Sequence, residues 1–197
     1  MKPALQWMLR SLSRWRWPCV MQVLLCCLTL HALDASAAGA ANSAERSVKA
    51  AFLYKFLGYV DYPAAQQPDA GAPYTVGVLD ADDIAAELVR LTAGHNINNH
   101  AVQVRVLHGG DALNGMQLLF IGNGAGEPAR LIRAAQALGI LVVSESDNGL
   151  QQGSVINFRL VDERIRFEIS LEAADKCNLK LSSRLLAVAY HVQKEGP

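Results

Sequence analysis

The stretch MQLLFIG, residues 116–122, is apolar at almost every position and ends at a glycine. A continuous apolar run of this kind is typical of a strand that is buried on both faces of a sheet. A second run, ILVVS, spans residues 140–144. Between them, residues 127–138 predict a helix with Pro128 in its first turn, where proline is tolerated. This part of the chain therefore predicts a strand–helix–strand unit of a sheet covered by helices on both faces.

The residues before this unit follow the same order. YTVGVLD, residues 74–80, and VQVRVL, residues 102–107, predict two strands, and residues 84–91 predict a helix between them. Further upstream, residues 44–60 predict a helix that is apolar over about half its circumference. Pro63 ends that element, because the residue before a proline avoids helical geometry.

The pattern changes in VINFRLVDERIRFEIS, residues 155–170. Its alternation on both sides of Asp162-Glu163 predicts an antiparallel hairpin with one face in the core. The inward set is expected to be Ile156, Phe158, Leu160, Ile165, Phe167 and Ile169, and the outward set Asn157, Arg159, Arg164, Arg166 and Glu168. Two short helices are expected to follow, from near Ser170 and from near Ser182 or Ser183, because serine is a favoured N-cap. The predicted fold class is α/β: a three-layer α/β/α sandwich with a Rossmann-like mixed sheet and a C-terminal antiparallel hairpin.

The beginning of the chain has the features of a secretory leader. Its first part contains the basic residues Lys2, Arg10, Arg14 and Arg16. An apolar run over residues 19–33 and the small residues Ala35-Ser36-Ala37 follow. The apolar run is shorter than the roughly 20 residues that cross a membrane, so cleavage after Ala37 is favoured over a membrane anchor. We expect a leader over residues 1–37 and a single domain over residues 38–197.

Charge and cysteine usage limit the function classes. The full chain has 18 basic and 18 acidic residues. The leader contains four basic residues and one acidic residue, so the exported domain is weakly acidic and a poor candidate for nucleic acid. After the leader, Cys177 is the one cysteine that remains. We expect it to be a buried small apolar residue, with a redox or intermolecular role as the alternative.

One possible ligand site lies where the predicted strands end. GNGAG, residues 122–126, stands between a strand and a helix, and Asp80 ends an earlier strand. Such a crevice can hold a ligand in an α/β protein, so Asp80, Gly122, Asn123 and Gly124 are the candidate ligand-binding residues. The segment lacks both the dinucleotide spacing and the P-loop lysine, and it is equally compatible with a simple turn. The acids at positions 80, 82 and 83 could hold a cation, although capping of the next helix explains them as well.

Catalytic signals are weak in this sequence. The histidines of HNINNH, residues 95–100, match no zinc spacing, and no Gly-x-Ser-x-Gly elbow occurs. We therefore expect no catalytic residue, no metal ligand and no cofactor. Two surfaces could instead contact another protein: Tyr54 and Tyr59 on the first helix, and Arg159 and Arg166 on the hairpin.

Both ends of the exported chain resemble one protein family. VKAAFLYKFLGYVDYP, residues 48–63, resembles the aromatic opening helix of the YfiR family. GSVINFRLVDERIRFEISLEAADKCNLKLSSRLLAVA, residues 153–189, is similar to the hairpin and helices that close the family's domain. The resemblance covers both ends of the domain, with the strands and helices between them in the family's order.

The resemblance implies a periplasmic regulator and not an enzyme. Characterised members bind the periplasmic domain of an inner-membrane diguanylate cyclase and thereby keep cyclic-di-GMP and biofilm formation low. An outer-membrane lipoprotein can sequester the repressor, and a homodimer is expected. Those members carry intradomain disulfides, which Cys177 alone cannot form. Two other classes remain open: a small-ligand binding module that uses the crevice near Asp80 and residues 122–126, and an unrecognised periplasmic enzyme.

Overall fold

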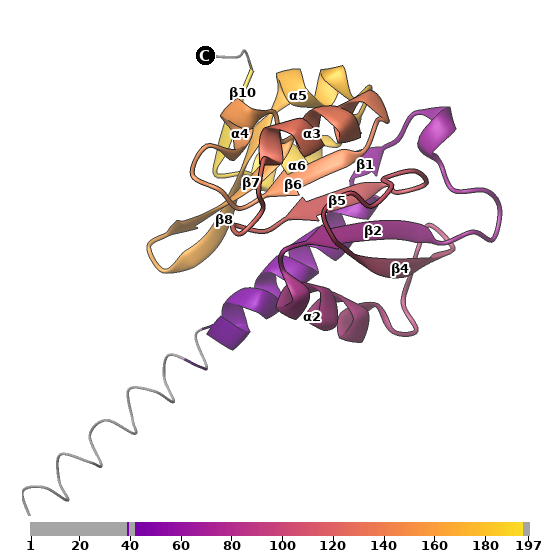
Figure 1. Ribbon diagram of the computed structural model, residues 1–197, viewed down its shortest axis with the longest axis horizontal. Helices are drawn as coiled ribbons and strands as arrows, with labels where there is room; N and C mark the ends of the chain where they lie inside the picture. Colours follow the sequence, from indigo (N-terminus) through magenta and orange to yellow (C-terminus); the bar gives the residue numbers. More distant parts are fainter. Residues whose placement is uncertain (1–38, 40–41, 195–197) are drawn as a thin grey trace, which may run out of the picture. The chain divides into compact units, whose positions relative to one another are not determined.

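The computed structural model describes residue 39 and residues 42–194. By its internal contacts the chain divides into two units, Met1–Ala44 and Glu45–Pro197. Of the first unit, residues 39 and 42–44 are described, and they are helical. The predicted leader, with its cleavage after Ala37, lies outside the described residues. The second unit holds the strands of the described chain (Figure 1).

An eight-stranded sheet with the order β10-β8-β7-β6-β5-β2-β4-β3 forms the centre of this unit. Its strands are β2 (Tyr74–Leu79), β3 (Asn96–Ile97), β4 (His100–Leu107), β5 (Leu118–Ile121), β6 (Leu141–Ser144), β7 (Ile156–Val161), β8 (Arg164–Ser170) and β10 (His191–Gln193). The neighbouring strands β7, β6, β5, β2 and β4 run parallel to one another. β7 pairs with β8 in antiparallel orientation. Apart from this sheet, β1 (Val60–Asp61) pairs with β9 (Lys180–Leu181). The predicted α/β class with a mixed sheet and a C-terminal hairpin is confirmed.

Helices cover both faces of the sheet and create two apolar clusters. Residues 45–58 form the N-terminal helix of the unit. The other helices are η1 (Ala64–Gln66), α2 (Asp82–Thr92), α3 (Pro128–Ala137), α4 (Gly149–Gln152), α5 (Leu171–Lys176) and α6 (Ser183–Val188). The larger cluster joins the N-terminal helix and α2 to one face, and the smaller joins α3 to the other. Figure 1 shows α2 and α3 on opposite sides of the sheet.

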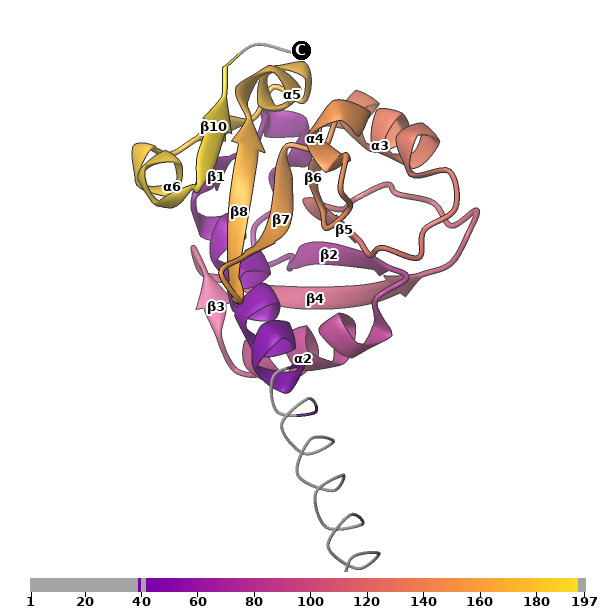
Figure 2. The ribbon, with the colours of Figure 1, turned by 90° about the vertical axis from the view of Figure 1, so that its left-hand side faces the viewer.

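The N-terminal helix is apolar because it packs against both the sheet and the hairpin. Leu53 and Leu57 are fully buried. The ring of Phe56 lies 5.1 Å from that of Phe167 and 6.0 Å from that of Phe158, measured between centroids. Figure 2 shows β7 and β8 running alongside this helix. Contacts between aromatic rings at these distances add to the burial of apolar area, so the helix and the hairpin stabilise each other.

The structure corrects two of the predicted hairpin orientations. Asn157, expected in water, is fully buried, whereas Leu160, expected in the core, is 65 % exposed. Leu160 is at the end of the hairpin, where the strand has passed beyond the covering core. Asn157 is near its base, where α4 and the loop before it cover the outward face. Alternation thus separates the two faces of the hairpin, but the neighbouring elements decide which residue is buried.

The predicted hairpin turn and the predicted serine N-caps are confirmed. Asp162 and Glu163 both have positive φ and connect β7 directly to β8, as in the two-residue turns that suit hairpins. Ser170 and Ser182 cap α5 and α6, because each side-chain oxygen accepts a hydrogen bond from a backbone N–H three residues later. Cys177 is fully buried, as predicted.

Candidate functional site

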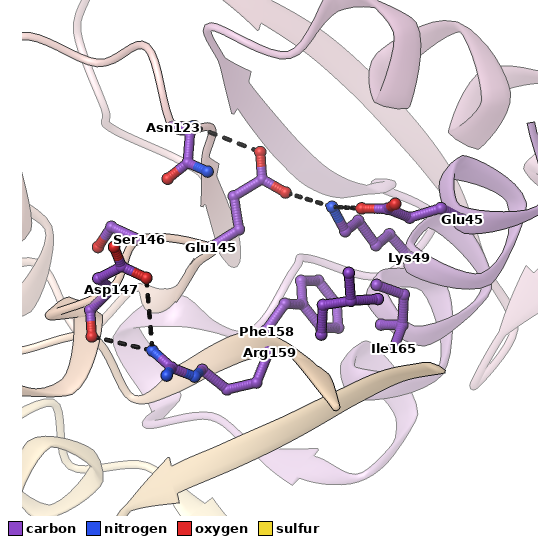
Figure 3. A pocket seen from close by; sticks show the side chains of 10 residues that line it. Glu45, Lys49, Asn123, Glu145, Ser146, Asp147, Phe158, Arg159 and Ile165 are labelled. Atoms are coloured by element: carbon purple, nitrogen blue, oxygen red, sulfur yellow. Dashed lines mark hydrogen bonds and ion pairs between the residues drawn. The ribbon is translucent and has the colours of Figure 1, made fainter. Parts of the chain in front are cut away.

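A cavity of about 310 Å³ opens beyond the carboxyl ends of β5 and β6 (Figure 3). Three parts of the fold surround it: the N-terminal helix, the loops after these two strands, and the β7–β8 hairpin. The lining residues are Glu45, Lys49, Asn123, Glu145, Ser146, Asp147, Phe158, Arg159, Leu160 and Ile165. The carboxyl edge of a parallel sheet is where α/β proteins most often hold ligands.

Lys49 is the central charge of the cavity. Its ammonium donates to Glu145 Oε2 over 2.6 Å and to Glu45 Oε1 over 2.5 Å. The second oxygen of Glu145 accepts a hydrogen bond from the backbone N–H of Asn123 over 3.3 Å. Figure 3 shows the Glu145 carboxylate between these two donors. The arrangement connects the N-terminal helix to the loops after β5 and β6.

The surroundings of Lys49 keep it protonated. Its side chain is 12 % exposed, and that of Glu145 is 16 % exposed. Burial by itself would lower the pKa of the Lys49 ammonium, but the hydrogen bonds to Glu145 and Glu45 outweigh it, so the pKa is raised. A lysine in this state is a fixed positive charge and not a general base. The ion triad is therefore suited to positioning a ligand or a loop, not to moving protons.

A second charge pair and an apolar wall complete the cavity. Arg159 Nη1 donates to the backbone oxygen of Asp147 over 3.0 Å and lies 3.8 Å from its carboxylate. Phe158, Leu160 and Ile165 supply apolar surface on the hairpin side. Groups of both signs beside an apolar wall suit a small molecule that has polar and apolar parts.

The buried side chain of Asn157 holds part of the cavity lining in place through its hydrogen bonds. Its side-chain oxygen accepts a hydrogen bond from Ser144 Oγ over 2.7 Å. Its amide donates to the backbone oxygen of Ser146 over 3.0 Å and to Glu168 over 3.1 Å. Because Ser146 lies in the loop that carries Glu145, these bonds hold that loop against the hairpin.

The predicted crevice residues come together next to this cavity. The parallel strand order changes direction between β2 and β5, as at the ligand-binding switch point of doubly wound folds. Asp80 follows β2 and Gly122 follows β5. A Cβ on Gly122 would lie 2.3 Å from the backbone oxygen of Asp80, and one on Gly124 would lie 3.7 Å from the Asp80 side chain. The two loops thus pack on each other, and of the four crevice residues Asn123 lines the cavity.

The predicted contact residues fall in two places. Arg159 and Arg166 are directly opposite each other on β7 and β8. Tyr59 is 38 % exposed near the end of the N-terminal helix. Tyr54 is half-buried, and its hydroxyl donates to the backbone oxygen of Asn96 over 3.2 Å. The structure therefore brings Asn123 and Arg159, taken from two separate predicted surfaces, into one cavity.

Sequence reasoning missed the ion triad around Lys49. Glu145 follows a buried strand directly, and Lys49 lies inside an otherwise apolar stretch, so each could have been noticed as unusual. Their pairing could not have been predicted from the sequence, because 96 residues separate them.

Two features are absent from the residues that the structure describes. Between residues 42 and 194, no cluster of three or more His, Cys, Asp or Glu side chains is arranged to hold a metal ion. Over the same residues, no helix has the length and apolar character that crossing a membrane requires.

The chain matches the model of a known protein family. Residues 46–190 match the family model described as YfiR/HmsC-like. The match covers most of the chain, from the N-terminal helix to the residue before β10, and it confirms the resemblance seen in the sequence. No curated protein is similar to the chain at a significant level.

Proposed function

This chain belongs to the YfiR/HmsC-like family, and we propose that it is a non-catalytic regulatory protein of the periplasm. In this proposal it binds the periplasmic domain of an inner-membrane diguanylate cyclase and keeps cyclic-di-GMP, and with it biofilm formation, low. The observation that carries the proposal is the family match over residues 46–190. That match includes both the aromatic opening stretch and the closing hairpin.

The contact surface in this proposal includes the outer face of the hairpin. Arg159 and Arg166 are directly opposite each other, and like charges in that position are unfavourable by roughly 0.2–1 kcal/mol. A partner that places carboxylates over the pair would remove this repulsion on binding. Tyr59 and the exposed part of Tyr54 would supply aromatic contacts, because tyrosine combines an apolar ring with a polar end.

The remaining parts of the proposal are supported by the sequence pattern of the leader and by what the family resemblance implies. The chain would be exported by its leader over residues 1–37 and would act as a single domain over residues 38–197, as a homodimer. An outer-membrane lipoprotein would sequester it and so release the cyclase. Control by an intradomain disulfide is left out, because Cys177 is the one cysteine after residue 37.

A deletion and complementation experiment tests the proposal. Deleting the gene should raise cyclic-di-GMP and surface attachment, and the wild-type gene should reverse both effects. The double variant Arg159→Glu/Arg166→Glu should be exported normally but fail to reverse them. Arg133→Glu on α3, also an exposed arginine, is the matched control and should complement fully. Unchanged cyclic-di-GMP in the deletion strain would contradict the proposal.

A second candidate function is binding of a small ligand in the cavity of Figure 3. The observation in its favour is that charges of both signs and an apolar wall share one cavity of about 310 Å³. A thermal-shift screen with small periplasmic metabolites tests it. A ligand at 100 times its Kd should stabilise the protein by about 2.7 kcal/mol. Asn123→Ala should reduce that shift, whereas the control Asn178→Ala, outside the cavity lining, should not.

A further inference from the structure

Three Asn-Gly dipeptides occur in the chain, at residues 114–115, 123–124 and 148–149. Glycine has no side chain to shield its backbone nitrogen or to restrict rotation of the backbone around it. That nitrogen can therefore attack Cγ of the preceding asparagine. The new C–N bond closes a five-membered succinimide ring, and the side-chain nitrogen leaves as ammonia. Water then opens the ring to aspartate or isoaspartate, so each amide that is lost consumes a water and releases an ammonia.

The reaction needs an accessible glycine nitrogen and a backbone that can rotate, and two of the three dipeptides meet both conditions. Asn114 and Asn123 are exposed, and so are Gly115 and Gly124. Among the described residues, neither glycine N–H donates to another backbone group. A Cβ on Gly115 would have no atom within 4 Å, and one on Gly124 would meet the Asp80 side chain at 3.7 Å. Both glycines therefore have open space around their backbone.

The third dipeptide is protected by the fold. Gly149 is buried at the start of α4, and its N–H donates to the backbone oxygen of Ser146 over 3.3 Å. A Cβ on Gly149 would lie 2.2 Å from Ser144 Oγ, so this side chain packs directly against the glycine backbone. Ring closure at Asn148 would have to break the hydrogen bond and rotate a backbone that has no room to move. The same dipeptide thus occurs in open and in protected surroundings, which gives an internal comparison.

We propose that Asn123 is a site of spontaneous deamidation in the folded protein, and that this modification adds a carboxylate to the cavity of Figure 3. Asn123 lines that cavity, whereas Asn114 does not. The lining contains three acidic side chains and two basic ones, which are Glu45, Glu145 and Asp147, and Lys49 and Arg159. Conversion of Asn123 raises the number of carboxylates to four, while the number of cations stays the same.

The isoaspartate form places the new charge close to Glu145. In isoaspartate the main chain continues through the former side chain, and the free carboxylate is bonded to the Cα that also carries the backbone nitrogen. The N–H on that nitrogen of residue 123 donates to Glu145 Oε1 over 3.3 Å. Two like charges then lie next to one N–H group, and their repulsion weakens the contact between the loop after β5 and Glu145. The modified cavity should therefore favour cations over anions, a consequence that rests on the proposed binding of a small ligand there.

Incubation of the purified, exported protein in warm, mildly alkaline buffer tests the proposal. Digestion at low pH, where little further amide is lost, and mass spectrometry of the peptides then measure the replacement of NH₂ by OH at each asparagine. We expect Asn123 and Asn114 to be converted at comparable rates. Asn148 should be converted at least about tenfold more slowly, because its reaction waits for local opening of α4. In denaturant the three rates should become similar.

The variant Gly124→Ala identifies the attacking nitrogen. The added methyl group shields that nitrogen, and it fits the structure, with the Asp80 side chain at an ordinary contact distance. The variant should therefore slow the conversion of Asn123 several-fold and leave the conversion of Asn114 unchanged as the control. Circular dichroism of the variant verifies that the fold is intact.

Three results would overturn the proposal. Conversion of Asn123 in denaturant only would show that the folded loop after β5 protects it. Equal rates at all three sites in the native protein would show that the fold does not control the reaction, and an unchanged rate in Gly124→Ala would exclude its nitrogen as the attacking group. Conversion of Asn123 in a protein that gives no ligand-dependent thermal shift would refute ligand binding alone. A thermal shift with Asn123 unmodified would refute the deamidation alone.

Discussion

Lys49 and Glu145 lie 96 residues apart in the sequence, yet 2.6 Å separates Nζ of one from Oε2 of the other. The pair joins the N-terminal helix to the loop after β6, and both residues line the cavity. Both side chains are largely withdrawn from solvent. Because water screens it little, this ion pair should contribute more to stability than the exposed pairs elsewhere on the unit.

Lys49→Met should therefore destabilise the protein by about 1–3 kcal/mol, since it leaves the carboxylate of Glu145 without its cation in a partly buried site. Urea unfolding followed by circular dichroism measures the change. Arg90→Ala is the control: the Arg90 side chain is 72 % exposed in its pair with Glu87, and we expect a loss of at most about 0.5 kcal/mol. Equal losses for the two variants would contradict a special role of Lys49.

The difference in stability between the wild type and Lys49→Met should depend on pH. The pKa of Lys49 is raised above its ordinary value of 10.5 by its carboxylate partners, against the effect of burial. The stability that the pair contributes is therefore complete below pH 10.5 and is lost as the pH rises through the folded-state pKa. The gap in stability between the wild type and Lys49→Met should narrow above pH 10.5. A constant gap up to strongly alkaline pH would exclude this explanation.

Cys177 should be unreactive in the folded protein. Burial raises the pKa of its thiol to about 11, and the residue is fully buried, whereas the thiolate is the reactive form. A chromogenic thiol reagent at pH 8 should modify it only after unfolding in denaturant. Rapid modification of the native protein would instead favour the redox or intermolecular role.

Gly122 and Gly124, in the loop after β5, should differ in how much stability is lost when each is replaced by alanine. Gly122→Ala would place a methyl group 2.3 Å from the backbone oxygen of Asp80, whereas Gly124→Ala would have the Asp80 side chain at 3.7 Å, an ordinary contact. We expect Gly122→Ala to lose roughly 2 kcal/mol or more, as other overpacked sites do. Gly124→Ala should change stability by less than about 0.5 kcal/mol. Thermal unfolding of both variants measures the difference.

Much of the fold could be predicted because its signals are local. Continuous apolar runs mark β5 and β6, and the alternation around Asp162-Glu163 marks the hairpin. The short strands β1, β3, β9 and β10 were not predicted, because two or three residues carry no periodic pattern. Their pairing depends on partners that are distant in the sequence, such as Ser170 for Gln193.

The candidate site was less predictable, because it depends on which loops meet. Gly122 and Asp80 were correctly expected at neighbouring strand ends, since parallel strands end on one edge of the sheet. The hairpin, however, extends beyond the sheet and brings Arg159 to the same edge as Asn123. No local pattern reports how far a hairpin projects. The burial of Asn157 was missed for a similar reason, because it depends on how the loop that carries Ser146 folds over β7.

The opposed arginines of the hairpin give a prediction that separates stability from function. Arg166→Gln removes one of two like charges that face each other across β7 and β8. It should raise the free energy of unfolding by about 0.2–1 kcal/mol. Arg164→Gln is the matched control, because its opposite residue is Val161, and its stability should not change measurably.

If Arg166 contacts the cyclase, the more stable variant should also repress it less well. Urea unfolding and cellular cyclic-di-GMP, measured on the same variant, should therefore move in opposite directions. A residue with a purely structural role would change both in the same direction. Full repression by Arg166→Gln, together with its gain in stability, would remove Arg166 from the proposed contact surface and leave Tyr59 and Arg159 to be tested separately.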